Sequence, residues 1–199
     1  MSQAARKFSH ISAADYLAQE NDGNWRHEYV DGVIYAMAGA SERHNLVRGN
    51  LAAILNNHLP ETCKVFSAEM KLQFVRDTRE RYYYPDVFVT CDPNDRDSHS
   101  RKTAVLVVEV LSDSTERVDR TEKFDTYTAI PTILEYGLLS QDAMELELFR
   151  RRTGWQREFY QRDNTVTLES VDLTISVSTL YRRISFEDPS LNPSITGLN

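Results

Sequence analysis

The sequence has few residues that cross-link or break a chain: its 199 residues include two cysteines, six prolines and seven glycines. No hydrophobic stretch approaches the length of a membrane span, and the amino terminus lacks the apolar segment of a signal peptide. We therefore expect a cytoplasmic protein. Cys63 and Cys91 lie in apolar surroundings and lack the spacing of a metal site, which favours reduced structural thiols.

Positive charge is also scarce. The chain carries 23 lysines and arginines against 30 acidic residues, which gives a formal net charge of −7. Proteins that bind DNA draw most of their non-specific affinity from neutralised phosphates, so this balance argues against a nucleic-acid partner without excluding one. Basic clusters occur at residues 76–81 and 150–152, but neighbouring acids make each of them typical of a solvated turn.

The composition is otherwise that of one globular domain. Hydrophobic residues make up 41% of the chain and charged residues 27%, and no repeat or linker divides it. We expect a flexible amino terminus over residues 1–11, a single domain over residues 12–186 and a disordered tail over residues 187–199.

Periodicity and turn residues predict the elements of this domain. Helices are expected at residues 12–20, at residues 41–59, from residues 112–116 to the break before Pro131, and at residues 180–184. Strands are expected at residues 28–37, as a hairpin around Asp31-Gly32, at residues 63–75, 82–91, 104–111 and 133–139, and in a meander between residues 145 and 177. The alternation places Lys71 on a solvent face, and the polar loop over residues 92–102 is expected to be mobile.

One acid stands in an apolar strand. Every neighbour of Glu109 between Ala104 and Leu111 is apolar, which is typical of a central strand covered on both faces. A buried carboxylate needs a partner. Asp86 begins the preceding strand after Pro85, and if the two strands pair, both acids converge and require a shared cation, for which hard oxygen ligands indicate Mg²⁺ or Mn²⁺.

Other interpretations of these residues remain open. Asp86 also fits a turn-capping acid, and Glu109 fits an ion pair with an arginine or lysine from elsewhere. In the following helix, Asp119, Lys123 and Tyr127 share one stripe at four-residue spacing. Lys123 can therefore face the strand ends, or it can pair with Asp119 on the helix surface.

These segments resemble a known family. Pro85-Asp86-Val87, residues 108–112 with Ser114 and Thr115, and Asp119-Arg120 with Lys123 and Tyr127 are similar to the Uma2 family of endonucleases, formerly a domain of unknown function. The family belongs to the restriction-endonuclease-like PD-(D/E)xK superfamily. With residues 28–32 and His44, the resemblance covers roughly residues 12–184.

The resemblance implies a fold, a substrate and a set of site residues. It implies an α+β fold with a restriction-endonuclease-like core, in which helices flank a mixed central sheet and an antiparallel meander follows. It also implies Mg²⁺- or Mn²⁺-dependent hydrolysis of nucleic acid, DNA in the first place, by a homodimer. The implied metal ligands are Glu28, Asp86 and Glu109, and the implied catalytic set adds Lys123 and His44.

For three of these assignments, the residues alone leave another interpretation open. Leu111 stands where the superfamily usually has lysine, and the resemblance implies that Lys123 takes over that role. Glu28 also fits a solvent-facing strand end. His44 also fits a hydrogen-bonded core residue, although the family implies that it handles a proton or a phosphate.

Two rival functions fit the same residues. The chain can be a catalytically inactive descendant of the nuclease fold that serves as a binding or regulatory module, which the acidic charge and Leu111 favour. Paired carboxylates can also hydrolyse glycosides without a metal. Trp25 and Trp155 are available to stack sugars, although neither lies beside the acid pair in sequence.

Overall fold

The computed structural model describes residues 10–22, 26–37 and 39–186, so most of the expected flexible amino terminus and the whole expected tail lie outside the described residues. The helices are α1 (Ala13–Asp22), α2 (Glu42–His58), α3 (Glu116–Val118), α4 (Phe124–Ala129) and α5 (Val177–Leu180). A π-helix, η1 (Asp119–Lys123), joins α3 to α4, and two short 3₁₀ helices are η2 (Arg151–Thr153) and η3 (Glu169–Val171). Among these described helices, none is long and apolar enough to cross a membrane.

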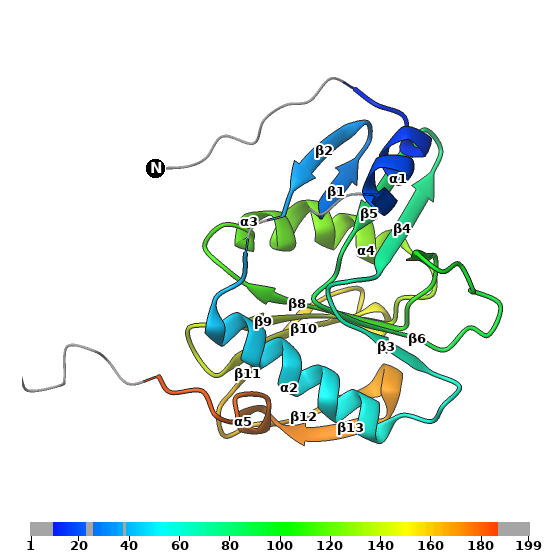
Figure 1. Cartoon of the computed structure of the whole chain (residues 1–199). Helices are drawn as coiled ribbons and strands as arrows, with labels where there is room; N and C mark the ends of the chain where they lie inside the picture. The colour runs from blue at the N-terminus through cyan, green and yellow to red at the C-terminus, as the bar shows by residue number, and fades with distance from the viewer. Residues whose placement is uncertain (1–9, 23–25, 38, 187–199) are drawn as a thin grey trace, which may run out of the picture.

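A six-stranded mixed sheet forms the centre of the protein (Figure 1). Its order is β11 (Arg157–Gln161), β10 (Glu145–Arg150), β9 (Glu135–Ser140), β8 (Leu106–Leu111), β6 (Val87–Thr90) and β3 (Lys64–Phe66). The β8–β9 pair is parallel and the other pairs are antiparallel. The expected pairing of the Asp86 strand with the Glu109 strand is confirmed, because Val87 lies opposite Val108.

A second sheet of five strands packs at the amino-terminal end of the fold. Its order is β2 (Val33–Ala36), β1 (His27–Val30), β5 (Arg79–Tyr83), β4 (Lys71–Arg76) and β7 (Ser100–Arg101). Asp31 and Gly32 form the predicted hairpin turn between β1 and β2 with φ of 49° and 95°, values that match the turn chemistry of Asp-Gly.

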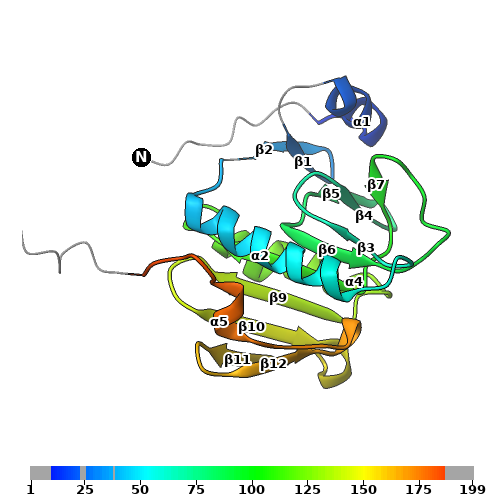
Figure 2. The same ribbon diagram turned by 60° about the horizontal axis from the view of Figure 1, so that its bottom comes forward.

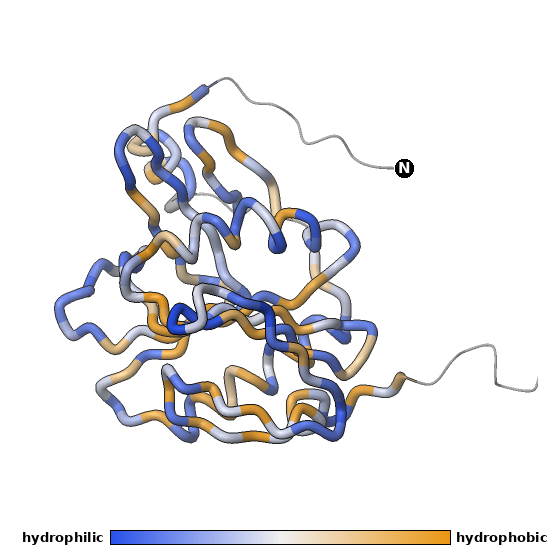
Figure 3. The backbone as a smooth tube through the Cα atoms, turned by 180° about the vertical axis from the view of Figure 1, so that it is seen from behind, coloured by the Kyte–Doolittle hydropathy of each residue, from blue (hydrophilic) through white to orange (hydrophobic). Residues whose placement is uncertain are grey.

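The six-stranded sheet is covered on both faces. Below it in Figure 1, α2, α5 and the separate pair β12 (Thr165–Leu168) and β13 (Leu173–Ser176) bury one apolar cluster, and Figure 2 shows α2 running across the sheet. On the other face, α4 and the strands β4 and β5 bury a second cluster around Phe88, Val107 and Tyr127. Hydrophobic backbone segments gather accordingly along the central strands (Figure 3). The predicted α+β class with a mixed central sheet flanked by helices is confirmed.

Two of the predicted strands are each divided between the sheets. Residues 63–75 form β3 and β4, which belong to different sheets, and the break contains Ala68 with φ of 53°. Residues 82–91 form the end of β5 and then β6, with Pro85 and Asp86 between them. The chain therefore crosses from one sheet to the other immediately before Asp86, and alternation alone did not reveal these crossings.

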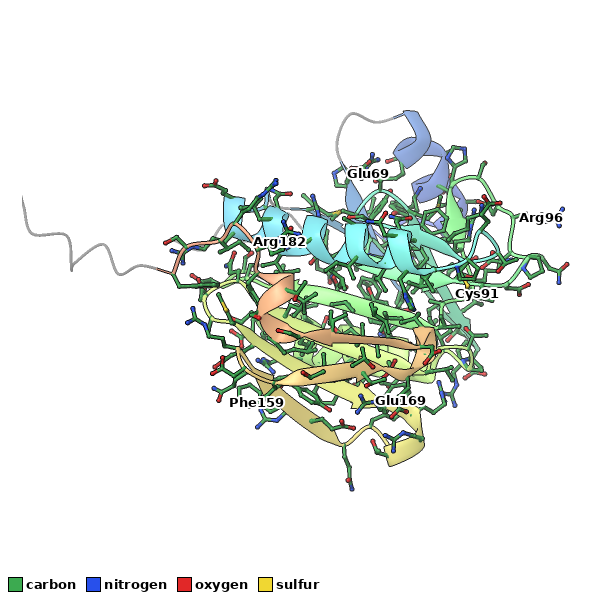
Figure 4. All side chains as sticks on the ribbon, turned by 90° about the horizontal axis from the view of Figure 1, so that it is seen from below. Glu69, Cys91, Arg96, Phe159, Glu169 and Arg182 are labelled. Carbon is green, nitrogen blue, oxygen red and sulfur yellow. A yellow bond between two sulfur atoms is a disulfide. The ribbon has the colours of Figure 1, made fainter. Side chains whose placement is uncertain are left out.

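The loop over residues 92–102 contains ordered contacts, and its expected mobility stays a prediction. Asp95 accepts hydrogen bonds from the backbone N–H groups of Lys102 and Thr103, and β7 within the loop pairs with β4. Figure 4 shows Arg96 where this loop projects from the body. The expectation that Lys71 faces solvent was wrong, because its side chain is 4% exposed and lies beside the ring of Tyr84 and the backbone carbonyl of His99.

The carboxyl-terminal elements and the cysteines also differ from expectation. The meander ends at β11, since β12 and β13 form their own two-stranded sheet, and the last helix is α5 rather than residues 180–184. Cys63 and Cys91 form a disulfide, where reduced thiols were expected. The reason is the register: Lys64 pairs with Thr90, so the two cysteines flank this pair on neighbouring strands.

Candidate active site

Asp86 and Glu109 are fastened to each other's strands. The backbone N–H of Asp86 donates to Glu109 Oε2 at 3.0 Å, and the N–H of Val110 donates to Asp86 Oδ2 at 2.8 Å. This exchange continues the β6–β8 ladder one step beyond Val87 with side-chain oxygens in place of carbonyls. Because two backbone amides fix the two carboxylates, their separation does not depend on flexible side chains.

Lys123 lies among three carboxylates. Its Nζ is 3.2 Å from Glu109 Oε1, from Glu28 Oε1 and from Asp119 Oδ1, and the ammonium donates a hydrogen bond to Glu109. The Asp119 contact is an ion pair without hydrogen-bond geometry. Glu109, Lys123 and Asp119 are exposed by 2%, 6% and 1%, so these charges interact in a poorly solvated site.

The π-helix η1 positions Asp119 and Lys123. Residues of η1 and α4 form one continuous helical segment after α3, and its inward stripe carries Asp119, Lys123 and Tyr127. A π-helical turn is wider than an α-helical turn, which alters the direction of side chains and is frequent at functional sites. The Tyr127 hydroxyl donates to Glu109 Oε1 at 2.9 Å, so two donors from this segment reach the same oxygen.

Glu28 comes from the other sheet. It lies on β1, its side chain is 16% exposed, and its Oε1 accepts a hydrogen bond from the backbone N–H of Tyr84 at 3.4 Å besides contacting Lys123. Tyr84 precedes Asp86 by two residues, so the crossing between the sheets brings Glu28 to the acids of the central sheet.

α2 contributes two side chains. Ser41 caps the helix by accepting from the N–H of His44, which fixes the first turn. His44 Nε2 lies 3.1 Å from Asp86 Oδ2, and its buried Nδ1 has no hydrogen-bond partner among the residues that the structure describes. One turn later, Arg48 Nη1 lies 3.8 Å from Asp86 Oδ1.

Burial governs protonation in this cluster. Burial raises the pKa of Glu109 to about 8, against the opposing effect of Lys123 and with further upward contributions from Asp119 and Asp86. Burial likewise raises the pKa of Glu28, with Lys123 opposing. The pKa of Lys123 is raised well above its ordinary value, because Glu109, Glu28 and Asp119 outweigh the effect of burial. The lysine is therefore a permanent cation at neutral pH.

The structure brings all five predicted site residues into one place, although their chemical roles stay predictions. Leu111 points into the second apolar cluster at 8% exposure, and Lys123 approaches Glu109 from the helix instead. Sequence reasoning placed Asp119 and Tyr127 on the correct stripe without assigning them to the site. It did not single out Arg48, for which four-residue spacing from His44 was the available signal.

The carboxylates of the site are chemically suited to a hard divalent cation. As they are arranged in the structure, two of them, Asp86 and Glu109, can serve as ligands. Carboxylate oxygens are the ligands that Mg²⁺ and Mn²⁺ prefer, and Mg²⁺ commonly uses only one or two carboxylates together with water and phosphate. Across residues 10–22, 26–37 and 39–186, no group of three His, Cys, Asp or Glu side chains is spaced to hold a metal ion. Asp86 Oδ1, which has only the distant Arg48 contact, and Glu109 are the residues that fit.

Comparisons with known proteins identify the fold and the family. The structure superposes on a crystal structure from Anabaena variabilis, described as "a putative nuclease belonging to DUF820", with a TM-score of 0.69 over 86% of this chain and 97% of that chain. The sequence identity of 16% means that this likeness concerns the fold.

Two relatives come from Synechocystis sp. (strain ATCC 27184 / PCC 6803 / Kazusa). "Uncharacterized protein slr1290" is 38% identical over 183 residues, which cover 90% of this chain and 95% of the relative. "Uncharacterized protein sll1609" is 31% identical over 145 residues, which cover 71% and 81%. The sequence model of Uma2, described as "Putative restriction endonuclease", matches residues 13–178. The match spans the strands, helices and acids described above, and the chain belongs to the Uma2 family.

Proposed function

We propose that the chain is a divalent-metal-dependent endonuclease that hydrolyses phosphodiester bonds of nucleic acid, with DNA as the substrate. The observation that carries the proposal is the exchange of hydrogen bonds between Asp86 and the Glu109 strand. It holds two acids side by side at the end of a central strand, with a buried ammonium 3.2 Å from one of them. Structural needs alone do not account for so many charges in one poorly solvated place.

In this proposal Asp86 and Glu109 hold Mg²⁺ or Mn²⁺, with Glu28 as the third acid of the site. When bound, the ion supplies Lewis-acid polarisation of the phosphate and a water of lowered pKa. Glu28 has a second duty, because its contact with Lys123 directs the ammonium towards Glu109.

In this proposal, Lys123 and His44 act on the attacking water and on the phosphate of the substrate. The ammonium of Lys123 orients the attacking water and stabilises the negative charge that grows on the phosphate oxygens. Nε2 of His44 faces Asp86, so this nitrogen is the one proposed to handle a proton or the phosphate in the site. Water attacks phosphorus directly and the ester oxygen leaves, so no covalent intermediate forms.

Plasmid cleavage tests the proposal. Supercoiled plasmid is incubated with Mg²⁺ or Mn²⁺ and the wild type, Asp86→Ala, Glu109→Ala or Lys123→Ala. We expect the wild type to nick the plasmid and each variant to lose about 100-fold or more, because each removes a group that acts in the transition state. Exposed residues supply matched controls: Asp113→Ala removes an acid and Lys102→Ala removes a lysine, and both should cleave like the wild type.

The other outcomes separate the rival functions. Equal nicking by every preparation would mean a contaminant and would remove the catalytic proposal. Cleavage that survives EDTA would contradict metal dependence. No cleavage, together with no Mn²⁺ binding in a calorimetric titration, would favour an inactive nuclease fold that serves as a binding module. A parallel RNA substrate decides between DNA and RNA. The homodimer that the family implies is measured by light scattering.

A further inference from the structure

Several arginines of this protein use their guanidinium groups to hold the fold together. Arg120 donates two hydrogen bonds to the carboxylate of Glu147, and Arg152 donates two to Glu169. Arg151 donates to three backbone carbonyl oxygens. Each of these groups is satisfied by the protein, as is usual for an arginine that stabilises a fold.

Arg48 differs from them. Its side chain is 24% exposed, and its Nη2 donates to Asn45 Oδ1 at 2.5 Å. Its Nη1 lies 3.8 Å from Asp86 Oδ1, which is too long for a hydrogen bond. A guanidinium has five N–H donors. Most of the donor capacity of Arg48 is therefore not used by the part of the chain that the structure describes.

The contacts of Asp86 leave one of its carboxylate oxygens beside Arg48. Asp86 Oδ2 already accepts from Val110 N–H and contacts His44 Nε2. Oδ1, the oxygen nearer to Arg48, is the one that remains for another cation. Arg48 thus stands beside the proposed metal position without filling it.

The charges of the site create a need for such a group. Three carboxylates, those of Glu28, Glu109 and Asp119, contact the ammonium of Lys123, and a fourth, that of Asp86, lies beside His44 and Arg48. A polyanion that approaches meets this negative potential first, and the whole chain adds a net charge of −7. A partly exposed arginine at the edge of the acids offsets that repulsion at the point where a phosphate would enter.

Resting on the proposed function, we propose that Arg48 is the positioning residue for the phosphate that is cut. Its free N–H groups donate to a non-bridging oxygen of the phosphodiester while the Asp86–Glu109 pair lies on the other side of the same phosphate. Arginine suits this task because its planar fork matches two phosphate oxygens. The guanidinium of Arg48 is then paired with Asp86 in the free protein and with the phosphate in the complex.

Arg43 supplies a matched control on the same helix. It carries the same charge and lies five residues earlier, with its own ion pair to Asp142 at 3.9 Å and its guanidinium over Phe186. The experiment compares the wild type, Arg48→Met, Arg48→Lys and Arg43→Met. Binding of a short fluorescein-labelled DNA duplex is measured in EDTA by anisotropy, and cleavage of the same duplex is measured with Mg²⁺.

We expect Arg48→Met to weaken duplex binding about tenfold and to lower the salt slope by about one, because one charge-assisted phosphate contact is lost. We expect Arg43→Met to stay within about twofold of the wild type. Arg48→Lys keeps the charge and loses the fork, so it should restore the salt slope and leave kcat/KM for cleavage reduced. Thermal unfolding midpoints of all four proteins show whether any variant fails to fold; if Arg48→Met does, Arg48→Lys decides through kcat/KM.

The inference is overturned if Arg48→Met and Arg43→Met bind the duplex equally, or if Arg48→Lys cleaves like the wild type. A wild type that binds the duplex and does not cleave it would contradict the proposed function alone. In that case the binding arm still decides the role of Arg48, so the two failures are distinguishable.

Discussion

Glu109 makes the stability of the metal-free protein depend on pH. Its pKa is raised from an ordinary 4.5 to about 8, so between these values the folded chain holds a proton that the unfolded chain has released. A folded state that binds more protons loses stability as pH rises. We therefore expect the contribution of this group to the free energy of unfolding to fall as pH rises across that window.

Urea denaturation in EDTA at several pH values measures this slope. Glu109→Gln is the matched variant, because it keeps the shape of the side chain and cannot ionise. Its slope should be flatter than that of the wild type, and identical slopes would show that Glu109 is ionised throughout the range.

Individual site residues were predictable to different degrees. Glu109 could be found because a charged residue in an apolar strand is conspicuous, and Asp86 because Pro85 marks a strand start. Arg48 could not be found in this way. A polar residue on the edge of an amphipathic helix looks the same whether it faces solvent or the rim of a site, and only the tertiary contact with Asp86 separates the two.

Among the strands, one buried ion-pair network attaches β12 and β13 to the central sheet. Glu135 on β9 accepts from Arg150 Nε, from the backbone N–H groups of Glu169 and Ser170, and from the Ser170 hydroxyl. Glu135 and Arg150 are exposed by only 1% and 4%. We expect Glu135→Ala to lower the free energy of unfolding by about 3 kcal/mol, because the backbone N–H groups of Glu169 and Ser170 lose their acceptor, while Arg150 keeps Glu158 as an ion-pair partner.

Guanidinium denaturation measures that loss. Arg152→Ala is the control, since its ion pair with Glu169 is exposed and should contribute little to stability. A similar loss of unfolding free energy in both variants would mean that the buried network stabilises the protein no more than the exposed ion pair does.

Prediction of the elements failed where tertiary contacts decide the backbone. Hydrophobic periodicity identified α2 and β8, because one-sided and two-sided burial leave clear patterns. It did not reveal that residues 63–75 belong to two sheets, since alternation continues through the break at Ala68. It also assumed α-helical geometry after residue 115, where the π-helix η1 lies.

At the scale of the whole molecule, residues from both sheets and from two helical segments form the site. Glu28 belongs to the five-stranded sheet and Glu109 to the six-stranded sheet, Asp86 directly precedes β6, and Lys123 belongs to η1 (Figure 1). A cation held there would bind only the folded chain. We expect Mn²⁺ at 100 times its dissociation constant to raise the free energy of unfolding by about 2.7 kcal/mol.

Asp86→Asn tests whether this gain comes from the site. Thermal unfolding with and without Mn²⁺ should show a shift in the wild type and in Asp113→Ala, and none in Asp86→Asn. An equal shift in Asp86→Asn would place the binding of Mn²⁺ elsewhere on the surface.

The crossing of the chain between its sheets has a consequence for its biosynthesis. A nascent chain that has emerged only as far as β8 exposes Glu28, Asp86 and Glu109 without Lys123, and without β9, which pairs with β8 in the folded protein. The acids cannot be assembled around an ammonium until later segments dock. The arrangement of Glu28 and Glu109 around Lys123 therefore forms only after the segment beyond β8 has emerged.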